Sequence, residues 1–468
     1  MKRVLLTILA VIVLALGLSA CGGTAATEEI IEEPEPTEAE ATEPEEDMAE
    51  EEDMSDEEDM ADEEDTSEDD MADDEAAGEP IRVGFITDQT GGLAIYGTMA
   101  ERSFRLGMEY ATGAPGEDDV WTLNGQEIQV FFRDDQSNPE TTATLARELV
   151  EVEEVDILVG TVSSGATATL QEVARENQIP LIVAPAAAND ITGASFNEYT
   201  FRVSRNNYQD AVALCQYLTQ QYDSFIQIAP DYSFGYGGAE ALRDACTEFG
   251  GEFVGEDVFA PADTQEFTPF LEPIVESDAD AWLVTWAGGG FIAMMQAASD
   301  LGLTESKPLG SSFIDNGTMP VFFANNIGTT SVILYHYTQP DNEVNDWFTE
   351  RMLEEYGTPP DLFDADGFNA ALLLAEALQE TGGDASADAM IEAMEGISFL
   401  GPKGEIFIRP GDHVAIQDMY IVTLENLDDP EFRYYSAVDT VRPEVPCLLP
   451  EELQDRCGDL PVGSLSGE

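Results

Sequence analysis

The sequence predicts an α/β fold of two lobes, each built on a doubly wound parallel sheet, joined by a hinge. The chain has 468 residues, which is more than a single domain usually holds. Buried strands alternate with helices in two successive series, and such alternation is typical of parallel sheets covered by helices on both faces. Further helices and strands follow the second series, and we expect them to complete the two lobes.

The first series begins at Ile81, where an acidic segment gives way to a buried strand over 81–87. Gly91-Gly92 and a helix over about 96–110 follow. Two β-rich runs flank Asn124-Gly125, which is a strong hairpin signal. Strands over 156–160 and 180–184, each preceded by a helix, extend the predicted first sheet.

The second series predicts strands over 225–229, 252–259 and 281–285, with helices between them. We expect the helices near 344–380 to return to the first lobe. The strands near 405–423 are expected to complete the second lobe. The predicted domains are a leader (1–20), a lipidated Cys with an acidic tether (21–80), lobe 1 (81–204 and 338–399), lobe 2 (205–337 and 400–441) and a C-terminal tail (442–468).

The first residues resemble a bacterial lipoprotein signal. Lys2 and Arg3 precede an apolar run over 4–18, which is short for a membrane span. Cys21 stands where this run stops, in Leu-Ser-Ala-Cys-Gly, and we expect it to carry the lipid that anchors the chain outside the cytoplasm. The alternative is an ordinary signal peptide with a chance Cys.

The charge balance is strongly acidic, with 96 Asp and Glu against 18 Lys and Arg. It argues against nucleic acid and against docking on anionic lipid. Thirty of the acids lie between Glu28 and Glu79, where we expect an extended, solvated spacer. Calcium binding is the weaker alternative, because the segment lacks the spacing of a calcium loop.

Four cysteines remain after Cys21, and an even number in an exported chain suggests disulfides. We expect Cys447 to pair with Cys457 and Cys215 with Cys246. Their spacing does not resemble a zinc site, and we expect neither a metal nor a cofactor. His336 and His413 stand apart from any nucleophile motif, so we do not expect an enzyme.

Five local motifs, in order along 81–441, resemble the Leu/Ile/Val-binding family of type I periplasmic binding proteins. They are Thr90-Gly91-Gly92-Leu93-Ala94-Ile95-Tyr96-Gly97, Asp134-Asp135-Gln136-Ser137-Asn138-Pro139, Val162-Ser163-Ser164-Gly165, Ile179-Pro180-Leu181-Ile182-Val183-Ala184-Pro185-Ala186-Ala187 and Asp231-Tyr232-Ser233-Phe234-Gly235. The resemblance implies a monomer that closes over a small solute and serves an ABC permease. A sensory subunit of the same fold is the alternative.

The resemblance also implies site residues. Ser164, beside Ser163, would bind a ligand carboxylate, although both serines could merely cap a helix. The carbonyl of Ala186 would accept from an ammonium group, and Ala188 stands where amino-acid-binding members carry Thr. Apolar walls would come from aromatic side chains, for which core packing is the alternative: Tyr96, Phe234 and Trp286.

The expected countercharge for an ammonium group is missing. Amino-acid binders of this family carry an acidic residue where this chain has Ser312. Asp315 could reach in instead, although an exposed loop position is the alternative. Because a buried ammonium without a countercharge is costly, amino acids, amides, small carboxylates and aromatic acids all stay open as ligands.

Overall fold

The computed structural model describes residues 79–312 and 314–467. The predicted leader, Cys21 and most of the acidic tether lie outside the described residues. Within the described part of the chain, no helix combines the length and the apolarity that crossing a bilayer requires. We call the part built on β1–β6 the first lobe and the part built on β7–β11 the second lobe.

The first lobe is built on a six-stranded sheet in the order β2-β3-β1-β4-β5-β6. Its strands β1 and β3–β6 run parallel, and β2 pairs antiparallel with β3. The two residues between β2 and β3, Asn124 and Gly125, have φ of 52° and 88°, as a tight hairpin turn requires. The strands are β1 (Ile81–Thr87), β2 (Val120–Leu123), β3 (Gln126–Asp134), β4 (Ile157–Gly160), β5 (Leu181–Val183) and β6 (Thr200–Arg202).

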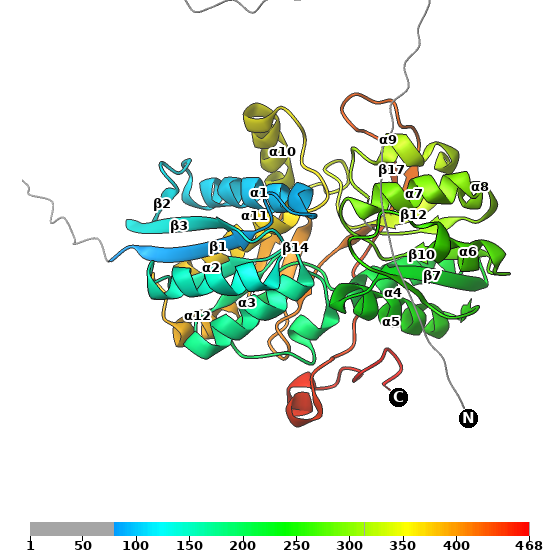
Figure 1. Cartoon of the computed structure of the whole chain (residues 1–468). Coiled ribbons are helices and arrows are strands. Elements are labelled where there is room, and N and C mark those ends of the chain that lie inside the picture. The colour runs from blue at the N-terminus through cyan, green and yellow to red at the C-terminus, as the bar shows by residue number, and fades with distance from the viewer. Residues whose placement is uncertain (1–78, 313, 468) are drawn as a thin grey trace, which may run out of the picture. The chain divides into compact units, whose positions relative to one another are not determined.

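Helices cover both faces of this sheet (Figure 1). Apolar side chains of β1 pack with α1, α10 and α11 in one buried cluster, and the opposite face packs with α2 and α3 in another. The helices of the first lobe are α1 (Ala94–Thr112), α2 (Pro139–Glu151), α3 (Ser164–Asn177), α10 (Glu343–Tyr356), α11 (Asp364–Glu380) and α12 (Ala387–Met394).

The second lobe is built on a parallel sheet in the order β11-β10-β7-β8, with β9 also pairing to β7. The single strand predicted over 252–259 is broken into two, because Gly255 between them turns the backbone at φ 82°. The strands are β7 (Ser224–Pro230), β8 (Glu252–Phe253), β9 (Val258–Ala260), β10 (Ala281–Val284) and β11 (Leu309–Gly310). The helices are α4 (Asn207–Leu218), α5 (Ser233–Glu248), α6 (Thr268–Glu276), α7 (Gly290–Asp300), α8 (Leu303–Ser306) and α9 (Met319–Phe322).

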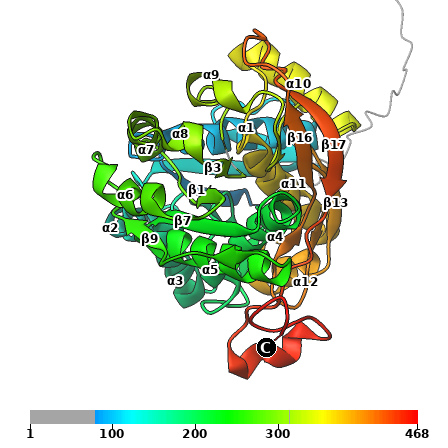
Figure 2. The same ribbon diagram turned by 90° about the vertical axis from the view of Figure 1, so that its right-hand side faces the viewer.

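Two small antiparallel sheets follow in the chain. Strands β12 (Thr330–Ile333), β16 (Met419–Leu424) and β17 (Tyr435–Val441) form one of them, and Figure 2 shows β16 and β17 side by side. Strands β13 (Ser398–Gly401), β14 (Gly404–Ile408) and β15 (Ala415–Ile416) form the other.

The strand over 404–408 does not belong where the sequence analysis placed it. Ile406 and Ile408 are fully buried in the apolar cluster of the first lobe, together with α11, rather than in the second lobe. Burial alternates along β14, and both isoleucines lie on its buried side, in the same cluster as α11. Because α11 belongs to the first lobe, β14 belongs there too. The parallel α/β sheets of two lobes nevertheless confirm the predicted fold class, and the other domain boundaries stay predictions.

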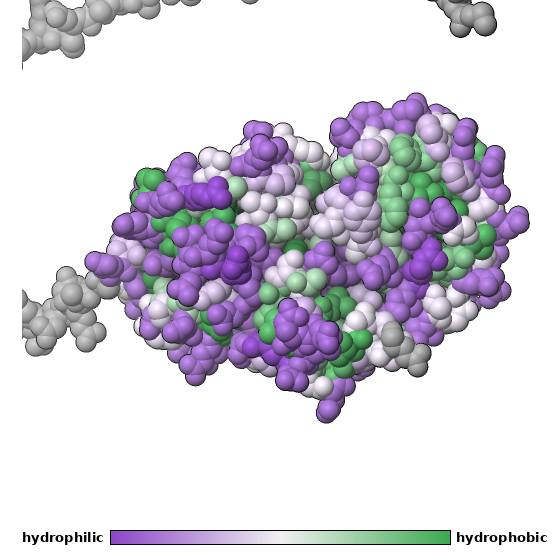
Figure 3. Space-filling view, turned by 60° about the horizontal axis from the view of Figure 1, so that its bottom comes forward, coloured by the Kyte–Doolittle hydropathy of each residue, from purple (hydrophilic) through white to green (hydrophobic). Residues whose placement is uncertain are grey.

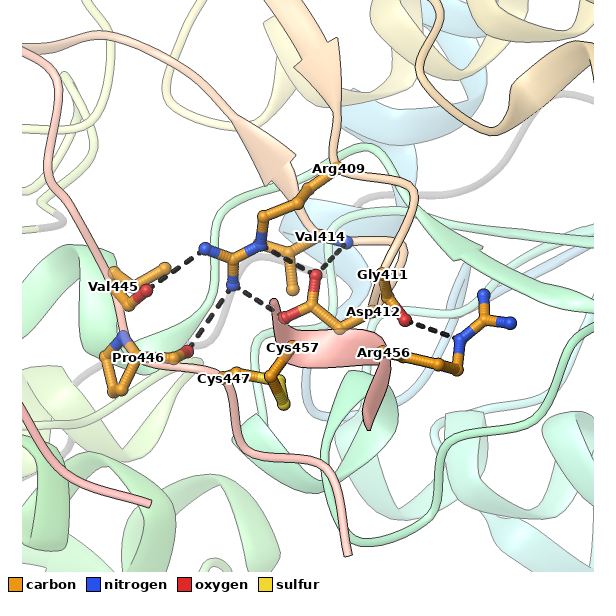
Figure 4. The surroundings of a disulfide bond; sticks show 9 residues. All are labelled: Arg409, Gly411, Asp412, Val414, Val445, Pro446, Cys447, Arg456 and Cys457. Carbon is orange, nitrogen blue, oxygen red and sulfur yellow. Dashed lines mark hydrogen bonds and ion pairs between the residues drawn. A yellow bond between two sulfur atoms is a disulfide. The ribbon is translucent and has the colours of Figure 1, made fainter. Parts of the chain in front are cut away.

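The C-terminal tail is fastened to both lobes, and Figure 4 shows its contacts with the segment around Arg409. Disulfides join Cys215 to Cys246 between α4 and α5, and Cys447 to Cys457 within the tail. Arg409 donates to the carbonyl of Val445 (3.1 Å), which holds the tail to the first lobe.

Beyond the disulfide, Arg456 donates to the carbonyl of Gly411 (2.8 Å) and to the carboxylate of Glu395 (2.8 Å), again in the first lobe. Farther along, Leu465 donates its N–H to Asp244 of α5 (2.9 Å), and Tyr208 of α4 donates to the carbonyl of Gly463 (3.4 Å). The tail therefore runs from one lobe to the other.

The surface of the described part is largely polar. Beyond Glu79 the chain still carries 66 acidic residues against 16 Lys and Arg. Figure 3 shows a face on which hydrophilic side chains dominate and hydrophobic ones form scattered patches. Such a surface favours solubility over docking on anionic partners.

Candidate functional site

A small pocket lies where the carboxyl ends of strands from both lobes meet. Its walls come from the residues after β1, β4 and β5 of the first sheet and after β7 and β10 of the second, which is where open α/β sheets bind ligands. The pocket is lined by Leu93, Tyr96, Val162, Ser164, Pro185, Ala186, Ala187, Arg205, Tyr232, Phe234, Ala287 and Phe363. The cavity volume is about 20 Å³, room for about one water molecule, so a larger solute requires the lobes to part.

The loop after β1 is built around a buried carboxylate. Asp88 accepts from the N–H of Leu93 (2.9 Å) and from the hydroxyl of Ser137 (2.7 Å), and these bonds hold the glycine-rich turn in place. Helix α1 then packs against this loop at Gly97, where a Cβ would lie only 1.7 Å from the carbonyl oxygen of Asp88. This close packing fixes the neighbouring Tyr96 in the pocket wall.

Tyr96 links the two lobes at the pocket. Its hydroxyl accepts from the N–H of Gly288 (3.4 Å), in the loop after β10. Burial raises the pKa of Tyr96 well above its ordinary value, so the hydroxyl keeps its proton and can donate it. Its ring packs edge-on against Phe363, with 4.9 Å between centroids.

Ser163 and Ser164 lie at the first turn of α3, directly after β4. Ser163 occupies the N-cap position, yet its side chain makes no capping hydrogen bond. The hydroxyl oxygen of Ser164 accepts from the N–H of Ala188 (3.1 Å), and a hydroxyl that accepts still has its own proton to donate. Ser164 therefore presents a donor to the pocket, whereas Ser163 does not line it.

The alanines after β5 contribute backbone rather than side chain. The carbonyl of Ala186 accepts from the hydroxyl of Ser204 (3.3 Å), and the carbonyl of Ala188 accepts from the guanidinium of Arg202 (2.6 Å). Ala186 lines the pocket and Ala188 lies behind it. Both carbonyls are already engaged within the first lobe.

Arg205 is a charged pocket residue that the sequence analysis missed. It follows β6, is 2% exposed and donates from Nη1 to the carbonyl of Pro185 (2.8 Å). Its Nε lies 3.5 Å from a carboxylate oxygen of Asp210, and its guanidinium carbon lies 5.0 Å from the ring centroid of Phe363. The sequence did contain a signal for this residue. Arg202 and Arg205 are two of only 18 Lys and Arg residues, and they stand close together where the chain passes from the first predicted lobe to the second.

Aromatic rings form the apolar walls. Phe234 is buried at the first turn of α5, with its ring centroid 5.9 Å from that of Tyr232. Phe363 stands just before α11 and belongs to the same buried cluster. Tyr232 and Phe363 were not predicted, since a lone aromatic residue in sequence is indistinguishable from core packing.

The structure does not bring Trp286 or Asp315 to this pocket. The ring of Trp286 packs edge-on against Phe267 (5.0 Å between centroids) inside the second lobe, which is the core packing held as its alternative. Asp315 accepts from the N–H of Thr318 (2.9 Å) and from its hydroxyl (2.5 Å), at the start of α9. Four of the eight predicted ligand residues line the pocket, namely Tyr96, Ser164, Ala186 and Phe234.

Arg205 belongs to a buried group of ionisable side chains. Arg202, Arg205, Lys403, Asp210 and Asp366 are each at most 8% exposed and interact electrostatically with one another. Burial raises the pKa of Asp210 to about 6 and also raises that of Asp366, while burial lowers the pKa of Arg202 to about 9. Other carboxylates also act on these cations: Asp412 and Asp190 favour the charged form of Arg202, and Asp418 favours that of Lys403.

Two parallel α/β lobes meeting at a donor-rich, aromatic-walled pocket define a bilobal solute-binding protein. Residues 80–429 match the family described as "Periplasmic binding protein". The chain belongs to this family, in its Leu/Ile/Val-binding group.

Relatives and solved structures support the same assignment. The chain is 25% identical over 368 residues to Leu/Ile/Val-binding protein homolog 6 of Brucella melitensis, covering 77% of this chain and 91% of that one. A structure described as an ABC-type branched-chain amino acid transporter from Rhodopseudomonas palustris is 30% identical (TM-score 0.65, 77% of this chain and 96% of that one). A solute-binding protein of an ABC transporter from R. palustris BisB5, in complex with 3,4-dihydroxybenzoic acid, is 25% identical (TM-score 0.69, 78% and 97%).

Proposed function

We propose that this chain is the extracytoplasmic solute-binding lipoprotein of an ABC importer. It captures a small polar solute between its lobes, closes by rotation at the hinge and presents the closed form to a membrane permease. The solute is a branched-chain or other amino acid, an amide or a small carboxylate. The chain acts as a monomer, anchored through Cys21, and releases its solute chemically unchanged.

The observation that carries the proposal is the pocket lined from both lobes. A ligand held there contacts both sheets, so its binding energy favours the closed arrangement over the open one. Related proteins support the same role, since one is described as a branched-chain amino acid transporter and another was solved with an aromatic acid.

A thermal-shift screen of amino acids, amides and small carboxylates tests the binding role. A ligand at 100 times its Kd should stabilise the folded chain by about 2.7 kcal/mol and raise its Tm. Mass spectrometry of the recovered ligand should return the compound unchanged. A screen without any stabilising compound, or recovery of a chemically altered ligand, would refute the proposal.

The anchor is tested separately. Expressed in a bacterium, the wild-type chain should sediment with membranes, whereas Cys21→Ala should remain in the soluble extracytoplasmic fraction. A Cys21→Ala chain that stays on the membrane would remove lipidation from the proposal and leave the binding role standing.

A further inference from the structure

We infer that the second lobe contains a second ligand site, a cavity between the edges of two β-sheets, which takes a small uncharged molecule bearing peptide-type amide groups. This edge cavity shares none of its described lining residues with the interlobe pocket. The inference therefore goes beyond the proposed function and does not depend on it.

The edge cavity lies between β11, at the edge of the parallel sheet of the second lobe, and β12, at the edge of the small sheet with β16 and β17. Its volume is about 270 Å³, against about 20 Å³ for the interlobe pocket. Small-molecule sites typically enclose about 300–1,000 Å³. The edge cavity is therefore large enough to admit a small ligand as it stands.

The first wall of the edge cavity is the free edge of β11. The carbonyl of Pro308 accepts from the N–H of Trp282 in β10 (3.0 Å). Successive residues of a strand direct their backbone groups to opposite sides. The N–H and C=O of Leu309 therefore point away from β10, toward the cavity that Leu309 lines.

The second wall is the free edge of β12. Leu424 donates its N–H to the carbonyl of Thr329 (3.0 Å), so the same alternation directs the backbone groups of Thr330 and Val332 away from β16. The hydroxyl oxygens of Thr330 and Thr423 lie 2.8 Å apart, as expected for an antiparallel pair that shares no backbone hydrogen bond. Thr330 and Val332 both line the cavity.

The two strand edges are joined at one end. There Leu334 donates its N–H to the carbonyl of Ser312 (3.2 Å). Elsewhere, no backbone hydrogen bond between described residues links the β11 edge to the β12 edge, and the cavity separates them. Backbone groups at a free strand edge readily bind another peptide group. A ligand with amide N–H and C=O groups can therefore bond to both edges at once.

The lining of the edge cavity is uncharged. Charged residues make up 24% of the chain, yet none of the described residues that line this cavity is acidic or basic. Apolar walls come from Leu218, Met319 and Phe323, and Ser311 is a lining residue, 6% exposed, whose hydroxyl bonds to no other described residue. A charged ligand would lose hydration here without gaining a countercharge, which is costly. The lining therefore favours an uncharged ligand.

Isothermal titration calorimetry of the full chain with N-acetyl-leucine amide tests the inference. This probe is uncharged and carries an amide group on each side of one residue. N-acetylleucine and leucine amide are the matched probes, because at pH 6 the first is an anion and the second is a cation. The uncharged probe should bind at least 10-fold more tightly than either charged one.

Substitution of Thr330 tests the backbone contact. Thr330→Pro removes the N–H that faces the cavity and leaves the ladder with β16 intact, so it should weaken the uncharged probe by roughly 3- to 10-fold, the effect of one hydrogen bond. Thr330→Val is the matched control. It loses the hydroxyl contact with Thr423 but keeps the N–H, and it should change the affinity by less than about 2-fold.

Hydrogen exchange of the wild-type chain locates the probe. Saturation with N-acetyl-leucine amide should slow the exchange of backbone N–H groups in residues 309–312 and 330–333. If Thr330→Pro does not fold, this measurement decides the question. The inference is overturned if the uncharged probe does not bind, if a charged probe binds as tightly, or if Thr330→Pro leaves its affinity unchanged.

Binding of the probe between the lobes is a distinguishable result. Exchange would then slow around Ser164 and Ala186 of the interlobe pocket and not in residues 309–312 and 330–333. That outcome overturns the second site and leaves the proposed function intact.

Discussion

Replacing Asp361 by Asn should make the protein more stable at pH 8 and change how its stability depends on pH. Asp361 stands just before α11, where its carboxylate accepts from the N–H of Leu362 (2.8 Å) and of Asn316 (3.1 and 3.2 Å). Burial, followed by the neighbouring charges of Asp315 and Asp364, raises its pKa from 3.8 to about 7. An Asn side chain keeps an oxygen for both N–H groups and carries no charge.

The sign of the effect follows from linkage. A carboxyl with a raised pKa in the folded chain binds its proton more tightly there than in the unfolded chain. Its contribution to stability is complete below the ordinary pKa of 3.8 and is lost as the pH rises through about 7. About three pKa units correspond to at most about 4 kcal/mol, most of which is already lost at pH 8.

Urea unfolding at pH 5 and pH 8 measures this effect. The gain of Asp361→Asn over wild type should be larger at pH 8 than at pH 5 by roughly 2–3 kcal/mol. Asp263→Asn, at an exposed position, is the matched control. Its free energy of unfolding should differ from that of the wild type by the same small amount at both pH values. The reasoning is wrong if Asp361→Asn gains nothing at pH 8, or if its gain does not depend on pH.

Two further substitutions test the construction of the pocket. Ser164→Ala should weaken a carboxylate ligand by about 1–3 kcal/mol in calorimetry, because it removes a hydroxyl donor, and an unchanged Kd would refute that contact. Gly97→Ala should destabilise the fold in thermal melts by more than the 1–3 kcal/mol typical of overpacking, since its Cβ would collide with the backbone of Asp88. Gly92→Ala is its control, with no atom within 4 Å of the added carbon, and equal Tm values for the two variants would contradict the close packing.

Local patterns predicted much of this fold, because each of them carries its own physical signal. The hairpin at Asn124-Gly125 forms as expected, since two residues with positive φ favour that turn. The parallel sheets follow from buried strands that alternate with helices. Strand β14 was assigned to the wrong lobe, because burial of Ile406 is visible in a sequence pattern whereas its packing partner is not.

The pocket was only partly predictable for the same reason. Ser164 and Ala186 both lie a few residues after predicted strands, and strand ends meet at one edge of a sheet. Arg205 and Phe363 reach the pocket from segments 158 positions apart in the chain, so their approach depends on how the lobes pack. Trp286 follows a strand in the same manner as the pocket residues, yet its ring turns into the core.

The C-terminal tail limits how far the two lobes can separate. Arg456 is hydrogen-bonded to the first lobe and Gly463 to the second, and seven residue-to-residue steps along the chain separate these two attachments. A stretch of that length spans at most about 25 Å when fully extended. If the lobes separate so far that the two attachment points lie more than this distance apart, one of the two attachments must break. The tail therefore limits how far the protein can open.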